Sequence, residues 1–395
     1  MITQSPAHSA PQIGRKFAAR LAMFYGTVFG SGGVYMPFFP VWLKAIGIDP
    51  TWIGAIIAVP AMTRLTTLPF IIGVAERRHA LRAAMIASAV LTMIGFFAIA
   101  MLRDPLAILL VFICTACVWT PMAALTDGYA LKGVLRYGLD YGPLRLWGSA
   151  AFAVGALICG ALVGVIAAVH LVWIIVAAMT LGALVSFGLQ PLGAPVADGT
   201  PLSRATELLR DRGFLAIAGS AALIQGSHAG YYTFASITWQ ASGYGGFTIA
   251  LLWTVGVIAE IVVFALSSRL TLRPPTLVMI GGLGALVRWC LTAQVLPFPV
   301  LVAVQLMHGM TFGLTQLGTM ALMLQHVPQH VMARAQGYIT ACTGLVMSSA
   351  AVLSGAVYAR YGDGVYYVMA ALGLSGAVVM WFGRGRAGAR SPDGA

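Results

Sequence analysis

Ala83-Ala-Met-Ile-Ala-Ser-Ala-Val-Leu-Thr-Met-Ile-Gly-Phe-Phe-Ala-Ile-Ala-Met101 is a run of 19 residues without a charged side chain. As an α-helix it extends about 28 Å at about 1.5 Å per residue, close to the ~30 Å hydrocarbon core of a bilayer. Comparable apolar ranges recur along the chain, near residues 17–43, 52–75, 80–102, 105–131, 142–166, 170–190, 213–240, 246–268, 275–295, 299–325, 332–357 and 363–383. These ranges predict an all-α membrane protein with twelve transmembrane helices.

The overall composition agrees with this class. Hydrophobic residues make up 59% of the 395 residues and charged residues only 9%, and the mean hydropathy is +0.89. Soluble globular domains contain about 25% charged residues. The composition therefore excludes an ordinary soluble domain and indicates a polytopic membrane protein.

The basic residues predict the orientation in the membrane. If the N-terminus is inside, the inner face receives 17 of the 23 Lys and Arg residues, and the outer face receives three. An excess of basic residues marks the cytoplasmic side. We therefore expect a bacterial inner-membrane protein with both termini and the polar stretch Pro191–Arg212 in the cytoplasm. Topology explains the net charge of +12, so the charge does not indicate nucleic-acid binding.

A weak internal repeat and the Pro191–Arg212 stretch divide the chain. Tyr35, Trp42 and Gly47 in the first helix recur as Tyr232, Trp239 and Gly243 in the seventh. The pattern predicts an N-terminal six-helix half at 1–190, a cytoplasmic linker at 191–212 and a C-terminal six-helix half at 213–395. Two parallel repeats of this kind place a substrate site near the midplane between the halves.

Ionisable side chains inside the apolar ranges are the main functional signal. On insertion scales an Arg or Asp at a helix centre costs about 2.5–3.5 kcal/mol, so such residues usually face a water-filled cavity and mark a substrate or ion path. The residues concerned are Arg64, Asp127, Arg145, His228, Glu260, Arg288 and His308. We therefore interpret the chain as a transporter and not as an enzyme.

Two acid–arginine pairs are expected from helix depth. Asp127 and Arg145 each lie about 6–8 Å inside the membrane, at matching depth in consecutive helices. Glu260 and Arg288 both lie near the midplane in the next half. Each pair either belongs to the substrate site or is a structural salt bridge, since buried pairs need not contribute net stability.

The other candidates also have two interpretations. His308 near the midplane is either a proton carrier or a neutral histidine bonded to a neighbour. His228 and Tyr232 either contact a ring-bearing ligand or pack, and Arg64 either binds substrate or caps carbonyl groups between helices. With Asp127 and Glu260 ionised, the intramembrane charges sum to +1. Because arginine binds carboxylate bidentately, charge balance favours a small organic anion as substrate.

Several longer blocks resemble a known family. They are Tyr35-Met-Pro-Phe-Phe-Pro-Val-Trp-Leu43, Asp140-Tyr-Gly-Pro-Leu-Arg-Leu-Trp-Gly-Ser149, Gln225-Gly-Ser-His-Ala-Gly-Tyr-Tyr232, Trp239-Gln-Ala-Ser-Gly-Tyr244 and Leu252-Trp-Thr-Val-Gly-Val-Ile-Ala-Glu260. These blocks resemble the 3-phenylpropionic acid transporter family of the major facilitator superfamily, in a clan that includes lactose-permease-like and nucleoside symporters. The resemblance implies the major facilitator fold and import of a small aromatic carboxylate by proton symport.

The resemblance also bears on the site residues. In lactose-permease-like proteins an acid and an arginine spaced like Asp127 and Arg145 belong to the substrate site. Those relatives also place an acid, the proton carrier, one turn after the tenth-helix histidine, and here that position is Thr311. We therefore expect Glu260 to take the proton, with His308 as the competing carrier.

No cofactor or metal is expected. Cys114 and Cys117 form a C-x-x-C without a second Cys or His pair, and thiols in an apolar span usually pack. The chain has no G-x-x-x-x-G-K-[ST] motif, so ATP is not the expected driver. The expected partners are a small organic anion, a proton and the lipid bilayer; a monomer is compatible with the sequence. Two alternatives stay open, a nucleoside or sugar proton symporter with neutral ligands and a transporter-like membrane sensor that binds ligand without moving it.

Overall fold

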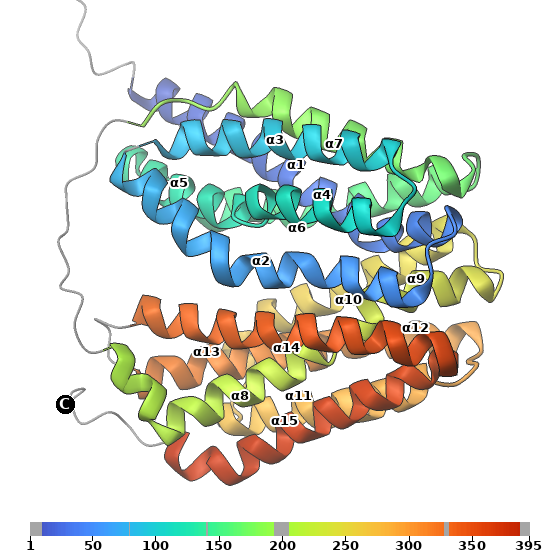
Figure 1. Ribbon diagram of the computed structural model, residues 1–395. Coiled ribbons are helices and arrows are strands. Elements are labelled where there is room, and N and C mark those ends of the chain that lie inside the picture. Colours follow the sequence, from blue (N-terminus) through green and yellow to red (C-terminus); the bar gives the residue numbers. More distant parts are fainter. Residues whose placement is uncertain (1–9, 79, 140, 193–204, 328–331, 388–395) are drawn as a thin grey trace, which may run out of the picture. The chain divides into compact units, whose positions relative to one another are not determined.

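A computed structural model describes residues 10–78, 80–139, 141–192, 205–327 and 332–387, and within them the chain is helical, without a strand (Figure 1). The main helices are α1 (Ala10–Ala45), α2 (Pro50–Arg77), α3 (Leu81–Met101), α4 (Pro105–Trp119), α5 (Met122–Tyr137), α6 (Tyr141–Val163), α7 (Leu171–Ser186), α8 (Arg212–Gly226), α9 (Ala229–Ala241), α10 (Gly246–Ala265), α11 (Pro274–Thr292), α12 (Phe298–His308), α13 (Thr315–His326), α14 (Met332–Tyr361) and α15 (Val365–Ala387). Each of the twelve apolar ranges coincides with one helix or with consecutive helices. The predicted all-α membrane fold is confirmed.

Three of the expected single spans are interrupted. Range 105–131 divides into α4 and α5 at Pro121, because proline has no N–H to donate and its ring clashes with the preceding turn. Range 213–240 divides at Ser227 and His228, where the His228 N–H bonds the Gln225 carbonyl three residues back, 3.1 Å away. Range 299–325 contains a π-helical turn between α12 and α13. Such turns occur frequently at functional sites.

Length and hydropathy also identify spans directly. Seven helical segments of the described chain are long and apolar enough to cross a membrane. One of them continues from α4 through most of α5, and another continues from α12 to α13. Local interruptions therefore leave the apolar character of these spans intact.

The described helices form two compact units. The first comprises Met1–Ile46, Thr66–Ala197 and Gly245–Ala250, and the second comprises Gly47–Leu65, Asp198–Tyr244 and Leu251–Ala395. Helices α2 and α10 each belong partly to both units. Residues 193–204 of the expected linker lie outside the described residues. The division into halves at 1–190 and 213–395 stays a prediction.

The first unit is built around α1, which packs against α6 and α7. Its core contains Phe17, Phe24 and Tyr129, all nearly inaccessible to solvent. Gly33 of α1 allows close approach to α6, because a Cβ there would overlap the Phe152 carbonyl oxygen. This packing holds α1, whose Tyr25 donates a hydrogen bond to the candidate residue Asp127.

The second unit packs α15 against α8 and α11, and α13 against α11. At the start of α8 the Asp211 carboxylate accepts the Phe214 N–H at 2.6 Å and the His326 Nε2 at 2.8 Å. Burial raises the pKa of Asp211, but the hydrogen bonds from Phe214 and His326 outweigh it, so this pKa lies below its ordinary value of 3.8. Asp211 therefore caps α8 and ties it to the end of α13.

The two helices that contain the internal repeat, α1 and α9, are each followed by a glycine in the same backbone conformation. Gly47 after α1 has φ +88° and Gly243 after α9 has φ +87°. Glycine adopts this left-handed conformation without the steric cost of a Cβ and is the usual helix C-terminal residue. The tryptophans that precede them, Trp42 and Trp239, are both buried.

Candidate functional site

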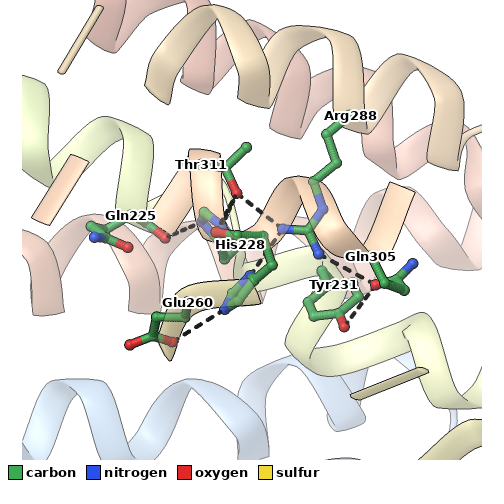
Figure 2. Close-up of polar contacts among 8 residues, drawn as sticks. Gln225, His228, Tyr231, Glu260, Arg288, Gln305 and Thr311 are labelled. Carbon is green, nitrogen blue, oxygen red and sulfur yellow. Dashed lines mark hydrogen bonds and ion pairs between the residues drawn. The ribbon is translucent and has the colours of Figure 1, made fainter. Parts of the chain in front are cut away.

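A connected group of polar side chains lies inside the second unit (Figure 2). The interruption between α8 and α9 presents His228, α10 presents Glu260 and α11 presents Arg288. The remaining members, Gln305, His308 and Thr311, come from α12 and the π-helical turn Gly309–Leu314. Irregular backbone within two of the apolar spans thus contributes to the group.

Close packing at Gly309 brings the π-helical turn to α10. A Cβ at Gly309 would lie 2.5 Å from the Ala259 carbonyl oxygen, so only glycine fits there without a shift. His308 directly precedes Gly309 and Glu260 directly follows Ala259, so this contact brings two candidate residues close together. His308 Nε2 lies 3.8 Å from a Glu260 carboxylate oxygen as a result.

Arg288 is fully buried and contacts neutral acceptors. Its NH1 nitrogen lies 3.0 Å from His308 Nδ1 and 3.1 Å from Thr311 Oγ1. Its NH2 nitrogen lies 3.4 Å from Gln305 Oε1. Within the described residues no carboxylate lies at ion-pair distance from the guanidinium, and the Arg288 Nε has no hydrogen-bond partner. Among the residues that the structure describes, this buried cation therefore has no counter-ion.

Aromatic rings complete the surroundings of Arg288. The guanidinium carbon lies 4.5 Å from the Trp289 ring centre and 4.8 Å from that of Tyr231. At these distances both rings stabilise the cation through their π-systems. They compensate part of the desolvation cost but do not neutralise the charge.

Hydrogen-bond chemistry assigns the tautomer of each histidine. Arginine only donates, so His308 Nδ1 accepts from Arg288 and its proton is on Nε2, facing Glu260. His228 Nδ1 lies 3.1 Å from the Ile224 carbonyl oxygen and therefore bears the proton. His228 Nε2, 3.1 Å from Thr311 Oγ1, is then the acceptor. His308, whose Nδ1 accepts from Arg288, is therefore neutral in this network.

Thr311 links two members of the group. Its hydroxyl oxygen accepts from Arg288 at 3.1 Å, and its single proton can be donated either to His228 Nε2 at 3.1 Å or to the His308 carbonyl oxygen at 3.4 Å. This is the position at which the resemblance to lactose-permease-like proteins implies an acid. A neutral hydroxyl there leaves the Arg288 charge in place.

The expected pair of Glu260 and Arg288 has a different arrangement from the one predicted. The contacts connect these two residues through His308 instead of directly. The sequence places both residues at similar depth, but the close approach at Gly309 puts the His308 ring between them.

Tyr232 lies beside the group. Its ring stacks on His228 at 5.8 Å between centres and on Trp253 at 6.0 Å. Tyr232 is half-buried, whereas His228 is fully buried. A ring-bearing ligand therefore has more access to Tyr232 than to His228.

The remaining candidates lie on α2, α5 and α6. Asp127 of α5 accepts a 2.6 Å hydrogen bond from the hydroxyl of the fully buried Tyr25 on α1. Arg64 lies on α2 and Arg145 on α6, but their side chains are outside the described residues. The pairing of Asp127 with Arg145 therefore stays a prediction.

Sequence reasoning missed Tyr25 and Gln305. A tyrosine in an apolar helix has no distinguishing pattern, so no signal marks Tyr25. Gln305 is a polar residue inside an apolar range and precedes His308 by three residues, which places both on one helix face. That spacing was an available signal.

Comparisons with known proteins agree with this architecture. Residues 18–369 match the family model described as MFS_1 like family. A curated Escherichia coli (strain K12) protein, "Probable 3-phenylpropionic acid transporter", is 33% identical over 363 residues, which cover 90% of this chain and 94% of that protein.

Solved structures show the same fold at low identity. A crystal structure of the nucleoside transporter NupG matches with a TM-score of 0.77 at 17% identity, covering 93% of this chain and 99% of that one. A bacterial homologue of the human lysosomal transporter Spinster, in an inward-facing and occupied conformation, matches with a TM-score of 0.74 at 12% identity, covering 95% and 98%. The chain belongs to the MFS_1 like family and is a multi-pass membrane transporter of the major facilitator superfamily.

Proposed function

We propose that the protein imports a small aromatic carboxylate of the 3-phenylpropionate type together with a proton. The buried Arg288 is the observation that supports this proposal most strongly, since its described hydrogen-bond acceptors are neutral. A substrate carboxylate supplies the counter-ion that this cation lacks. The name of the Escherichia coli relative points to the same class of substrate.

Aromatic side chains favour a ring on the substrate. Tyr231 and Trp289 already contact the Arg288 guanidinium, and the half-buried Tyr232 lies one residue further along α9. Offset or edge-to-face contacts between rings contribute about 0.5–1.5 kcal/mol beyond burial. The proposed substrate contacts in the second unit are Arg288, His228 and Tyr232. Arg64, Asp127 and Arg145 stay candidate contacts on the sequence argument alone.

Glu260 is the proposed proton carrier. Protonating His308 at Nδ1 would replace its hydrogen bond from Arg288 by an N–H that faces the guanidinium, which brings two cations together. His308 is therefore a poor carrier while it accepts from Arg288. Glu260 lies on the other side of His308, and its side chain is 25% exposed whereas that of His308 is 10% exposed.

Substrate binding and proton uptake are coupled because the substrate replaces His308 as a hydrogen-bond acceptor of Arg288. When the substrate carboxylate engages Arg288, the guanidinium no longer needs His308 Nδ1 as an acceptor. His308 is then free to reorient relative to Glu260, and the Glu260 carboxylate takes up a proton from water as the substrate is bound. Substrate and proton load together, which is symport.

Uptake into liposomes tests the substrate class. Wild-type protein should accumulate 3-phenylpropionate on an inward-directed proton gradient, and a protonophore should abolish the accumulation. Arg288→Lys keeps the charge but loses the planar fork, so substrate affinity should fall about 10–100-fold, equivalent to about 1.5–3 kcal/mol. Arg269→Lys is the control, because Arg269 is exposed after α10. Uptake of nucleosides with no competition by carboxylates would instead support the neutral-ligand symporter, and binding without counterflow would support the sensor.

Two variants separate the proton carriers. Glu260→Gln should lose proton-driven accumulation but keep substrate counterflow, while His308→Gln should retain part of the proton-driven uptake. A Glu260→Gln protein that still concentrates substrate on a pH gradient would transfer the role to His308.

The orientation in the membrane has its own test. A single Cys introduced at Thr200 should not be labelled by an impermeant reagent added outside intact cells.

A further inference from the structure

We propose that Gln305 determines the charge specificity of the site by orienting Arg288 without neutralising it. The inference rests on the proposed function in one respect, namely that Arg288 receives the substrate carboxylate. Gln305 is fully buried on α12, one turn before His308. None of the candidate roles assigned from the sequence includes it.

The contacts of Gln305 fix which end of its amide faces Arg288. Arginine only donates, so the amide oxygen faces the guanidinium. Gln305 Oε1 accepts from Arg288 NH2 at 3.4 Å and from the Tyr231 hydroxyl at 3.0 Å. The amide nitrogen lies 3.4 Å from the Leu301 carbonyl oxygen of its own helix. Gln305 thus holds the guanidinium and the Tyr231 ring that packs on it.

A glutamate at this position would have nearly the same shape and the opposite consequence. Its carboxylate would sit where Oε1 now lies, beside Arg288 NH2, and would form an ion pair with the cation. The internal carboxylate would then compete with the carboxylate of the substrate. A neutral amide provides the same two acceptor contacts and leaves the positive charge for the substrate.

Gln305 is not the only uncharged acceptor that contacts Arg288. Its other acceptors, Thr311 Oγ1 and His308 Nδ1, are also neutral. Glu260 is separated from Arg288 by the His308 ring. Among the described neighbours, Gln305 is the one that a single isosteric change converts into a buried counter-ion.

The experiment compares Gln305→Glu with wild type in purified protein, using 3-phenylpropionate and its uncharged amide as probes. At neutral pH the variant should bind the acid at least about tenfold more weakly and the amide with nearly unchanged affinity. As the pH falls and the introduced carboxyl group is protonated, acid binding should recover. Gln305→Met keeps the length without charge, so it should weaken both probes to a similar extent.

Gln294→Glu is the matched control. Gln294 also bonds a tyrosine hydroxyl, that of Tyr367 at 2.5 Å, but it is exposed after the end of α11. The control should bind both probes like wild type. Unfolding midpoints provide a readout that needs no substrate: Gln305→Glu should raise the midpoint at neutral pH, because it supplies the missing counter-ion, and should lose this gain as the pH falls.

Each result has a defined meaning. Equal loss of acid and amide binding by Gln305→Glu, or acid binding unchanged from wild type, would overturn the inference. If wild type binds neither probe, the proposed function fails, and the unfolding midpoint then decides on Gln305 alone. A Gln305→Glu midpoint that does not rise would show that the Arg288 charge is already compensated and would also overturn the inference.

Discussion

Replacing Thr311 by valine is the sharpest test of the network around Arg288. Valine has nearly the same shape as threonine but lacks the hydroxyl. The substitution removes the hydroxyl that accepts from Arg288 NH1 at 3.1 Å and lies 3.1 Å from His228 Nε2 and 3.4 Å from the His308 carbonyl oxygen. It adds no charge and little volume, so the effect isolates one hydroxyl.

The magnitude follows from the contacts that remain. Arg288 NH1 keeps His308 Nδ1 as an acceptor, so the charge-assisted bond to Thr311 is only partly lost, from a full value of about 1.5–3 kcal/mol. His228 Nε2 loses its described partner, and a buried acceptor left unsatisfied costs about 1–3 kcal/mol. We expect a total loss of about 3 kcal/mol in the free energy of unfolding of the second unit. At about 2–4 °C per kcal/mol, the unfolding midpoint should fall by about 6–12 °C.

The assay measures the thermal unfolding midpoint and 3-phenylpropionate affinity of purified protein. Thr311→Ser retains the hydroxyl and should lose only about 1 kcal/mol for the missing methyl group. Thr233→Val is the second control, because Thr233 is equally buried and its hydroxyl bonds only the Ala229 carbonyl of its own helix, at 2.8 Å. Both controls should keep substrate affinity near that of wild type.

One result would refute the reasoning. If Thr311→Val unfolds at the wild-type midpoint and binds substrate with wild-type affinity, then the hydroxyl does not connect Arg288 to His228 in the working protein. A fall in stability equal to that of Thr233→Val would lead to the same conclusion, since it would reflect only the loss of a buried hydroxyl.

Two further predictions concern other parts of the chain. Tyr25→Phe removes the phenol hydroxyl that donates to Asp127, so substrate affinity should fall about tenfold, as for loss of a hydrogen bond to a carboxylate. Tyr129→Phe, in the same core, is the control and should leave substrate affinity unchanged. If a binding titration gives the same affinity for Tyr25→Phe as for wild type, Tyr25 does not belong to the site. Asp211 has a lowered pKa in the folded protein, so its ionised form stabilises the fold above about pH 4 and this contribution is lost as the pH falls through the folded value. The midpoint difference between wild type and Asp211→Asn should therefore be largest at neutral pH and should narrow in acid, and a difference that does not vary with pH would show that the contact with His326 does not depend on the carboxylate charge.

The membrane class and the positions of the apolar spans followed from the sequence alone, but the interruptions within three of these spans did not. Runs such as Ala83–Met101 are helical because a backbone in hydrocarbon satisfies its N–H and C=O groups only within a helix or a closed barrel. The requirement is local, so composition and length were sufficient. The sequence also paired Gly47 with Gly243 in the internal repeat, and the structure adds that both adopt the left-handed conformation.

The choice of buried charged residues was also accessible from the sequence, because charge in an apolar range is costly and therefore conspicuous. Arg288, His308 and Glu260 were identified in this way, and the structure places them in one contiguous group. Their depth along each helix could be counted at 1.5 Å per residue. Counting gives the height of a residue but not the direction in which it points around its helix.

Only the tertiary structure decided which side chains meet. The π-helical turn at Gly309–Leu314 and the close approach of Gly309 to Ala259 insert His308 between Glu260 and Arg288, and no local pattern predicts that approach. Gln305 and Tyr25 acquire roles for the same reason: each is an ordinary residue on its own helix until a neighbouring helix brings Arg288 or Asp127 within hydrogen-bond distance. Helix formation depends on contacts within a segment, whereas hydrogen-bond partners depend on how separate helices rotate and pack against one another.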